Sequence, residues 1–474
     1  MIAVLFFFFS QAKIDHSSDF LKIQDYLTTY NALSSIKVDC FTNQIISSKI
    51  SDKNINICFY NCTFASFNPS LENSTILHGS IIRLISSTSK FDLCNFINNS
   101  INSTPNCFVF LNSTITFFSK CNFLKNSINI TENYNGFIIY SLSCNFTIND
   151  CIFRDNYAYS DKIKDQTYII NGNLISIRTS NSSFNNCSFL QNTIYMDYQN
   201  GTHYHLRIHG GLIAIYNSLC DFIGCNFANN TFLLNPTCDI IVDGGLLYMQ
   251  SSIGSIKSCI FTENFVITVF RSNHKIWGGL ISSRVSNFTF SFCIFMVNTI
   301  NIEGIYKHDI WGGSIYLYKS YDNFIECSFK NNTIIMNSIS NFEGIIFGGS
   351  ICSEMSIFSM LECNFLGNNI NINSTSNSNI HGGSIFLTSS LITFWFCSFK
   401  FNNFSINVHE YDSTIEGGLI YVYKTHFDNF DCLYTNNMFI LNIAIAIDIN
   451  SIAIYFDSSN GTIHECLFTN NIIQ

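Results

Sequence analysis

One recurring position in this sequence carries side chains that could bind a ligand or transfer a proton. The position stands directly before each of seven glycine pairs, and we call this set of residues the ligand strip. Imidazole and carboxylate groups can exchange protons, and aromatic faces can stack on sugars or peptide side chains. Aromatic residues that only cover the edge of a loop would produce the same pattern, so both interpretations stay open. The ligand strip comprises His209, Asp243, Trp277, Trp311, Phe347, His381 and Glu416.

Catalysis by these residues is not the expected outcome. Enzymes that cleave polysaccharides need clustered carboxylates, often with calcium, and basic residues close by. Here the carboxylates are scattered, and the one basic stretch that resembles part of such a site, Arg207–Gly211, has no acidic partner motif. Cysteine and histidine spacings typical of zinc sites are absent as well. The sequence therefore predicts no catalytic residue, metal ligand or cofactor, and we expect a protein that is not an enzyme.

The strip belongs to a repeat that must position it. A Cys-x-Phe-x-x-Asn motif returns along most of the chain, with steps of 34 residues from Cys225 to Cys259, Cys293 and Cys327. In all seven glycine pairs the second glycine lies 14 residues before the motif cysteine. The length of the repeat unit therefore varies only between the motif Asn and the next glycine pair. A fixed period of this size indicates a repeat architecture. The clearest copies are Cys225, Phe227, Asn230, Cys259, Phe261, Asn264, Cys293, Phe295, Asn298, Cys327, Phe329 and Asn332.

Apolar and polar residues alternate with a period of two inside each unit, which predicts short strands rather than helices. One unit per coil gives an all-β solenoid of about thirteen rungs, stacked about 4.8 Å apart, with repeats of about 34 residues. Equivalent Cys and Phe side chains would then form buried files, and the Asn would occupy a sharp left-handed turn. Stacked cysteines are poorly placed for bridging, so we expect a reduced file. The better candidates for disulfides lie outside the motif: Cys40, Cys58, Cys107, Cys144, Cys220, Cys238 and Cys352.

The two ends of the chain suggest further divisions. Residues 1–12 resemble a signal peptide, with an apolar stretch over Ile2–Phe9 and a small-x-small site at Ser10–Ala12. A buried first strand is the alternative. Residues 13–47 are predicted to form an N-terminal cap with a short helix over Ser17–Leu33, covering the first open edge, and residues 48–474 form the repeats.

Composition restricts the partners and the compartment. Charged residues make up 12% of the chain, the net charge is −9 and no basic stripe occurs, so we expect no nucleic-acid binding. The most apolar stretch, Met438–Phe456, is interrupted by polar residues, and no transmembrane helix is expected. Asn-x-Ser/Thr triplets favour an extracellular or cell-surface location. The glycosylation candidates that fit solvent-facing positions are Asn61, Asn186, Asn229 and Asn331.

The pairing of Gly-Gly-[Leu/Ser]-[Ile/Leu] with Phe-x-x-Asn resembles the repeats of the polymorphic membrane protein family, first recognised in chlamydial surface proteins. Related repeats occur in surface proteins of parabasalid protists, and the Asn, Ile and Phe content suits such an organism. The resemblance covers about residues 79–474. It implies a right-handed, pectin-lyase-like parallel β-helix at the cell surface with a role in adhesion. Leu or Ser stands where the family often has Ala, and the mode of anchoring is open.

These observations lead to three hypotheses. The first is a secreted or cell-surface adhesin or binding scaffold without catalysis, which recognises glycans or host or self surface proteins by its lateral face and loops. The second is a degenerate carbohydrate-active or glycan-binding β-helix that acts through the ligand strip. The third is a purely structural surface-coat protein. The ligand and the oligomeric state stay open.

Overall fold

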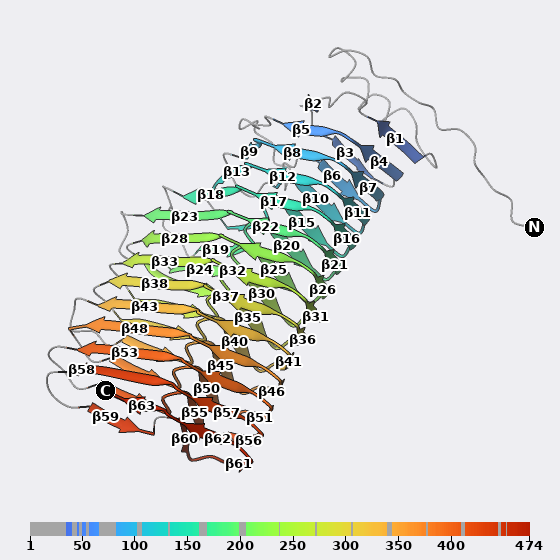
Figure 1. Cartoon of the computed structure of the whole chain (residues 1–474). Coiled ribbons are helices and arrows are strands. Elements are labelled where there is room, and N and C mark those ends of the chain that lie inside the picture. The colour runs from blue at the N-terminus through green and yellow to red at the C-terminus, as the bar shows by residue number, and fades with distance from the viewer. Residues whose placement is uncertain are drawn as a thin grey trace, which may run out of the picture.

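The chain folds into a stack of parallel coils (Figure 1). The computed structural model describes residues 35–39, 45–46, 50–53, 56–65, 82–101, 107–130, 133–160, 168–198, 205–236, 238–270, 273–304, 307–338, 344–375, 378–408, 413–443, 447–451 and 453–474. Within these residues every strand pairing is parallel, and no helix occurs. The predicted all-β parallel β-helix, or β-solenoid, is therefore confirmed.

Five parallel sheets run along the stack, and we name them A to E. In the described part of the chain they hold 14, 14, 13, 12 and 10 strands. Their outermost strands are β1 (Ser35–Asp39) and β61 (Asn460–His464) in sheet A, β2 (Ile45–Ile46) and β62 (Leu467–Thr469) in sheet B, β3 (Ile50–Lys53) and β60 (Ile454–Asp457) in sheet C, β9 (Ser100–Ile101) and β63 (Ile472–Ile473) in sheet D, and β14 (Tyr134–Asn135) and β59 (Ile447–Asn450) in sheet E.

One turn contributes one strand to each sheet in the order C, A, B, D, E. A representative turn contains β25 (Ile213–Tyr216), β26 (Leu219–Ile223), β27 (Asn226–Ala228), β28 (Thr231–Pro236) and β29 (Asp239–Asp243). The pair Gly244-Gly245 then leads into β30 (Leu247–Gln250) of the next turn. The Cys-x-Phe-x-x-Asn motif spans sheet B and the corners on either side of it. The variable loop lies between sheets D and E.

The corners between sheets C, A, B and D are two residues long, and the first residue of each is left-handed. Asn217, Gly224 and Asn229 show this in the representative turn, with φ of 49°, 64° and 56°. The motif Asn is therefore not the left-handed residue that the sequence predicts; the residue before it is. That prediction was wrong because Asn can serve a turn in two ways, by its own backbone conformation or by its side-chain hydrogen bonds.

The motif asparagines form a buried ladder of amide groups instead. Asn264 donates from Nδ2 to Phe227 O at 2.8 Å and to Asn298 Oδ1 at 2.9 Å. Its Oδ1 accepts hydrogen bonds from both the backbone N and the Nδ2 of Asn230. Both amide hydrogens and the carbonyl oxygen are thus satisfied within the stack, as a buried amide requires. The same pattern continues from Asn99 to Asn437, where the side chains are buried.

A second ladder, which sequence analysis missed, occupies the corner between sheets C and A. The backbone N of Ser218 donates to Ser252 Oγ at 3.2 Å, and the backbone N of Ser252 donates to Ser286 Oγ at 3.1 Å. The ladder runs from Ser180 through Ser390 to Thr425 and Ser459. Each of these residues stands seven positions before a motif cysteine, so the signal was present in the sequence.

The predicted files of Phe and Cys fill one continuous core. Phe227, Phe261 and Phe295 stack with ring centroids 4.8 Å apart and nearly parallel planes. The motif cysteines from Cys94 to Cys466 are thiols, and most donate to a carbonyl oxygen of the preceding turn, as Cys293 does to Ile256 O at 3.0 Å. The prediction of disulfides outside the motif was wrong for six cysteines, which are thiols as well: Cys58, Cys107, Cys144, Cys220, Cys238 and Cys352. Cys40 lies outside the described residues.

The glycine pair is explained by two different contacts. Gly244 has φ of 64°, and a Cβ there would lie 2.0 Å from Leu247 O. Gly245 has ordinary φ, but its Cβ would lie 2.1 Å from Gly279 O of the next turn and 3.3 Å from Val266 of sheet D. The backbone of the next turn and a side chain of sheet D therefore leave no room for any side chain on the second glycine.

The N-terminal predictions fall mostly outside the described residues. The signal peptide at residues 1–12 and the helix over Ser17–Leu33 lie there, as does most of the cap. β1 and β2, which lie inside the range 13–47, already pair with β4 (Asn56–Tyr60) and β5 (Thr63–Ala65). The capping helix and the count of about thirteen rungs remain predictions.

One acidic residue lies inside the core. Asp322, on β41 (Tyr321–Ile325), is buried, and its Oδ1 accepts from Phe288 N at 2.8 Å. Its Oδ2 is buried without a hydrogen-bond partner. Burial raises the pKa of Asp322 to about 7. The ionised carboxylate is therefore unfavourable in the folded chain at neutral and alkaline pH.

Replacing an asparagine in the middle of the amide ladder should destabilise the protein. Asn264→Ala leaves Phe227 O and the amides of Asn230 without their buried partner, and we expect the free energy of unfolding to fall by roughly 2–4 kcal/mol. Urea unfolding measures this change. Lys257→Ala, on an exposed residue of the same turn, is the control and should unfold at the wild-type midpoint. An unchanged midpoint for Asn264→Ala would contradict the structural role of the ladder.

Asp322→Asn should stabilise the protein in a pH-dependent way. Between about pH 4 and pH 7 the Asp322 carboxyl group is ionised in the unfolded chain but still protonated in the folded chain. The free energy of unfolding of the wild type therefore falls as pH rises through that window. The difference amounts to about 4 kcal/mol if the shift is expressed in full. Urea unfolding at pH 8 should therefore show a higher midpoint for Asp322→Asn, and unfolding at pH 4 should show little gain. The exposed residue Glu326, changed to Gln, provides the matched control.

Candidate functional site

The structure places the seven residues of the ligand strip side by side. Each is the last residue of a strand of sheet E, and the strands pair in register. Asn171 precedes His209 in the same row. The register thus brings together residues up to 207 positions apart in the sequence, because each turn advances the row by one strand. The row reads His209, Asp243, Trp277, Trp311, Phe347, His381, Glu416.

A second row of side chains, on sheet C, lies against the strip. The glycine pair turns the chain between sheets E and C, so side chains from the outer faces of both sheets meet at this corner. His209 stacks on Tyr248 with centroids 4.6 Å apart, and Phe347 contacts Phe386 at 4.9 Å. The register pairs the members of this row turn by turn, and they are Tyr248, Ser282, Tyr316, Cys352, Phe386, Tyr421 and Tyr455.

Sequence analysis did not find this second row. From Tyr248 to Tyr421 its residues stand three positions after the second glycine of a pair, so a fixed offset was available. Alternation within a strand cannot show that the outer faces of two different sheets meet, and so the row looked like ordinary surface. Its members are largely buried outside the main core; Tyr316, Cys352, Phe386 and Tyr421 form a separate apolar cluster with the strip residues Trp277, Trp311 and Phe347.

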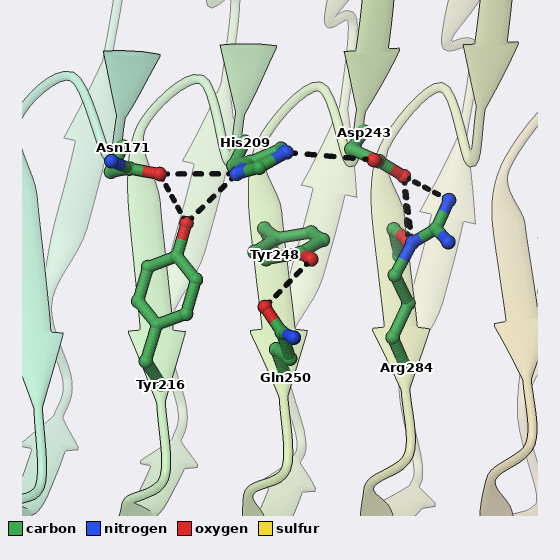
Figure 2. Close-up of polar contacts among 8 residues, drawn as sticks. Asn171, His209, Tyr216, Asp243, Tyr248, Gln250 and Arg284 are labelled. Carbon is green, nitrogen blue, oxygen red and sulfur yellow. Dashed lines mark hydrogen bonds and ion pairs between the residues drawn. The ribbon is translucent and has the colours of Figure 1, made fainter. Parts of the chain in front are cut away.

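At its N-terminal end the strip is a closed polar network (Figure 2). His209 Nδ1 lies 3.0 Å from both Asn171 Oδ1 and the Tyr216 hydroxyl. The Tyr216 hydroxyl also donates to Asn171 Oδ1. Arg284 donates to Asp243 Oδ1 from Nε at 3.0 Å and from Nη2 at 2.6 Å. The side chains of Asn171, His209 and Asp243 are therefore directed at neighbours in the same protein.

Burial decides the charges of this network. It lowers the pKa of His209 to about 3, so the ring is neutral at physiological pH, although Nε2 lies 3.8 Å from Asp243 Oδ2. Burial also raises the pKa of Asp243 to about 6, against the opposing effect of Arg284. Asp243 is thus ionised and paired with Arg284 at neutral pH. His209 is neutral and enclosed, and the charge of Asp243 is compensated by Arg284. Such a pair is a poor general acid or base.

The middle of the strip is aromatic. The Arg284 guanidinium lies over the rings of Trp277 and Tyr316, 4.6 Å and 5.1 Å from their centroids. Trp311 contacts Phe347 with centroids 4.1 Å apart. Trp277, Trp311 and Phe347 are half-buried, so part of each ring is open to solvent. This section can offer apolar and π-faces to a ligand.

The C-terminal end of the strip is aromatic and acidic. His381 stacks on Phe347 at 5.0 Å, and its Nδ1 lies 2.7 Å from Glu416 Oε2. The Tyr421 hydroxyl donates to Asp457 Oδ2 at 3.1 Å. Burial and then the charges and hydrogen bonds of Glu416 and Asp457 raise the pKa of Tyr421 well above its usual range. Two carboxylates therefore lie close to one phenol hydroxyl.

The described residues contain no group of histidine, cysteine or acidic side chains that could hold a metal ion. Within the same ranges there is also no helix long and apolar enough to cross a membrane. The glycosylation candidates occupy left-handed corner positions: Asn186, Asn229 and Asn331 are exposed and Asn61 is half-buried, with φ between 52° and 56°. Their modification remains a prediction.

No family model, no curated protein and no solved structure matches the chain.

His209→Gln should change how stability depends on pH. Because the pKa of His209 lies near 3 in the folded chain and about 6.5 when unfolded, acid protonates the unfolded chain first. Wild-type stability contributed by the neutral ring is therefore present above pH 6.5 and lost as pH falls toward 4. The variant should be less stable at pH 8, since it loses the stack on Tyr248, and this deficit should shrink on acidification. Urea unfolding at pH 8, 6 and 4.5 measures it.

The matched control for this experiment is His426→Gln. His426 lies on sheet A, and hydrogen bonding to Asn460 raises rather than lowers its pKa. We expect the His426→Gln variant to lose at least as much stability on acidification as the wild type does. Parallel curves for wild type and His209→Gln would contradict a neutral His209.

Proposed function

We propose that the protein is a non-catalytic binding scaffold, secreted or displayed at a cell surface, which holds an extended partner along the ligand strip. The observation that carries this proposal is the register of the strip: seven residues on adjacent strands form one row, with a second row of aromatic side chains beside it. A row of this kind presents one side chain at every turn, about 4.8 Å apart. That geometry suits a long ligand better than a small molecule.

The packing of the rings supports binding. Trp311 is fixed between Phe347 and the rings of Tyr316 and Phe386, with centroids 4.1–6.4 Å away. Side chains already held in place lose little conformational freedom when a ligand arrives, so they contribute more of their contact energy to affinity. The titratable groups of the strip, by contrast, are engaged with each other, which argues for recognition rather than chemistry.

The motif pairing supports the cell-surface part of the proposal. Its resemblance to the repeats of the polymorphic membrane protein family favours adhesion as the biological role. A glycan-binding protein is the second candidate, and the half-open faces of Trp277 and Trp311 favour it because sugar rings stack on such faces. A purely structural coat protein has no particular residue in its favour.

The strip can be tested by removing its two tryptophans. Trp277→Ala with Trp311→Ala should weaken binding to glycan arrays or to cell surfaces about tenfold or more, as expected for central aromatic contacts. Trp395→Ala is the matched control, because Trp395 is 40% exposed on sheet A and stacks on Phe430, away from the strip. Circular dichroism verifies folding of each variant. Equal binding by the double variant would move recognition to the loops, and no binding by the wild type would favour the coat protein.

A further inference from the structure

Sheet A presents an apolar outer surface. Its strands follow one another along one side of the stack, and seven of them run from β26 to β56 (His426–Phe430) (Figure 1). On these strands and at the corners beside them large apolar side chains are exposed, from 37% for Leu361 to 58% for Tyr321. We call this surface the A face. Its exposed apolar members are Leu219, Ile223, Ile253, Val285, Phe292, Tyr321, Met355, Ile357, Leu361, Leu391, Trp395 and Phe396. Exposed apolar surfaces of this extent are typical of contacts with another molecule.

The two corners that border the A face differ in charge. The corner between sheets C and A carries the exposed lysines Lys319 and Lys424, and over the described turns from β26 to β56 it has no acidic residue. The corner between sheets A and B carries Glu326, Glu362 and Asp431, and over the same described turns it has no basic residue. Lys319 and Glu326 belong to one turn, and Lys424 and Asp431 to another. Opposite charges therefore lie at opposite borders of the A face.

The charged groups of both borders are accessible to a partner. The two lysine nitrogens lie 5.1 Å and 4.7 Å from the ring centroids of Tyr318 and Tyr423 on sheet C, and the lysines stay exposed. A cation–π contact at an exposed site is weak, so a carboxylate of another molecule can compete with it. Glu326 and Glu362 are exposed as well, and Asp431 is half-buried. The borders can thus pair with a surface that carries the reverse pattern.

The A face is complementary to itself under one rotation. A twofold axis parallel to the rod brings two A faces together with the rods parallel, and each turn then faces the same turn of the second copy. Because this rotation exchanges the two corners, Lys319 faces Glu326 of the second copy, and Lys424 faces Asp431 of the second copy. Two A faces with antiparallel rods would instead set lysines against lysines and acids against acids. The charge pattern therefore favours the parallel arrangement.

The apolar side chains match under the same rotation. The first residue of each strand faces the fifth residue of the same strand in the second copy, because the strands run in opposite directions across the contact. β46 (Ile357–Leu361) thus sets Ile357 against Leu361, and β51 (Leu391–Trp395) sets Leu391 against Trp395. Seven turns about 4.8 Å apart, each about 23 Å wide across the A face, give roughly 800 Å² per copy. That is the area that a standard specific interface buries on each partner.

We propose that two copies of this chain form a parallel dimer through their A faces. The dimer is independent of ligand binding, because the ligand strip lies at the corner between sheets E and C and sheet C separates it from the A face. The two strips of a dimer run parallel to each other. A partner that reaches both strips is held more tightly by avidity alone.

Sedimentation velocity on the full chain tests the dimer at concentrations from about 1 to about 100 µM. Asn287 lies on the A face within an Asn-x-Thr triplet, and a glycan there would hold the two copies apart. The protein is therefore produced in a bacterial host, which leaves this asparagine unmodified. We expect the mass of two chains at the upper concentrations. A monomer over the whole range overturns the proposal.

A charge placed in the apolar part of the A face should disrupt the dimer. Ile357→Asp buries two carboxylates in the contact, one from each copy, and should raise the dissociation constant at least about tenfold. Val269→Asp is the matched control, because Val269 is 42% exposed against 43% for Ile357 but lies on β33 (Phe265–Phe270) of sheet D. The control should dissociate like the wild type, and circular dichroism verifies the folding of both variants. Equal effects of the two substitutions would overturn the proposal, because they would report the added charge and not the A face.

Charge reversal tests the orientation of the two copies. Glu326→Lys faces Lys319 of the second copy in the parallel dimer and should weaken it about threefold or more. Adding Lys319→Glu re-forms the pair with its charges exchanged and should return the dissociation constant close to the wild-type value. In an antiparallel dimer Glu326→Lys would relieve repulsion at the acidic border and strengthen association. Stronger association of the single variant, or no recovery in the double variant, overturns the parallel dimer.

Failure of the dimer can be told from failure of the proposed function. A chain that binds its ligand as a monomer overturns only the dimer, and a dimer that binds neither glycans nor cell surfaces overturns only the proposed function. Trp395 lies on the A face and is also the control for Trp277→Ala with Trp311→Ala. Both tryptophan variants are therefore compared in the Ile357→Asp background as well, where a difference in ligand binding reports the strip alone.

Discussion

The stack depends on one buried interaction, the hydrogen bonding of each motif asparagine to its equivalents in the neighbouring turns. The side chain of Asn264 accepts two hydrogen bonds from Asn230 and donates one to Asn298 and one to the carbonyl of Phe227. A shift of one residue between turns would break all four in a place that water cannot reach, and the penalty would recur at every turn. A one-residue shift would also move the apolar side chains out of the core, because side chains alternate between the faces of a strand. A two-residue shift keeps those faces, and apolar stacking alone would tolerate it, whereas the amide ladder would not. The amide ladder therefore makes the register specific, and the serine ladder at the opposite corner reinforces it.

The surface follows from that register. Because turns align without slippage, any outward position becomes a row, and a property repeated every 34 to 36 residues becomes a continuous strip. The glycine pair adds the second requirement: it lets sheet E turn sharply into sheet C, so that side chains from two faces meet. The loops between sheets D and E absorb all variation in length. The core and the strip are thereby insulated from insertions, as expected when function is carried by a repeated face.

The strip is not uniform along the rod. Its N-terminal section is filled by its own polar groups, with Asp243 neutralised by Arg284 and His209 kept neutral by burial. Its C-terminal section has rings and carboxylates without an arginine from the same chain. In that section His381 is bonded to Glu416, and the Tyr421 hydroxyl donates to Asp457. The change between the two comes from single substitutions at one position of sheet C, which a repeat fold tolerates because each turn contacts only its neighbours.

The sequence alone was sufficient for the strand-forming class, the period, the buried Phe and Cys files and the membership of the strip, because these follow from spacing and from alternation along one chain. It was not sufficient for the role of the motif Asn, since the residue type is compatible with a left-handed turn and with an amide ladder, and only neighbouring turns show which hydrogen bonds exist. It could not show the thiol state of Cys144, Cys220 or Cys352, which depends on the distance to other cysteines in space. Nor could it place Tyr421 beside Glu416 and Asp457, because that contact joins the outer faces of two sheets across a corner. Periodicity determines which residues share a row; the angle at which two sheets meet, set by the glycine corner and the packing of sheet D, decides which rows touch.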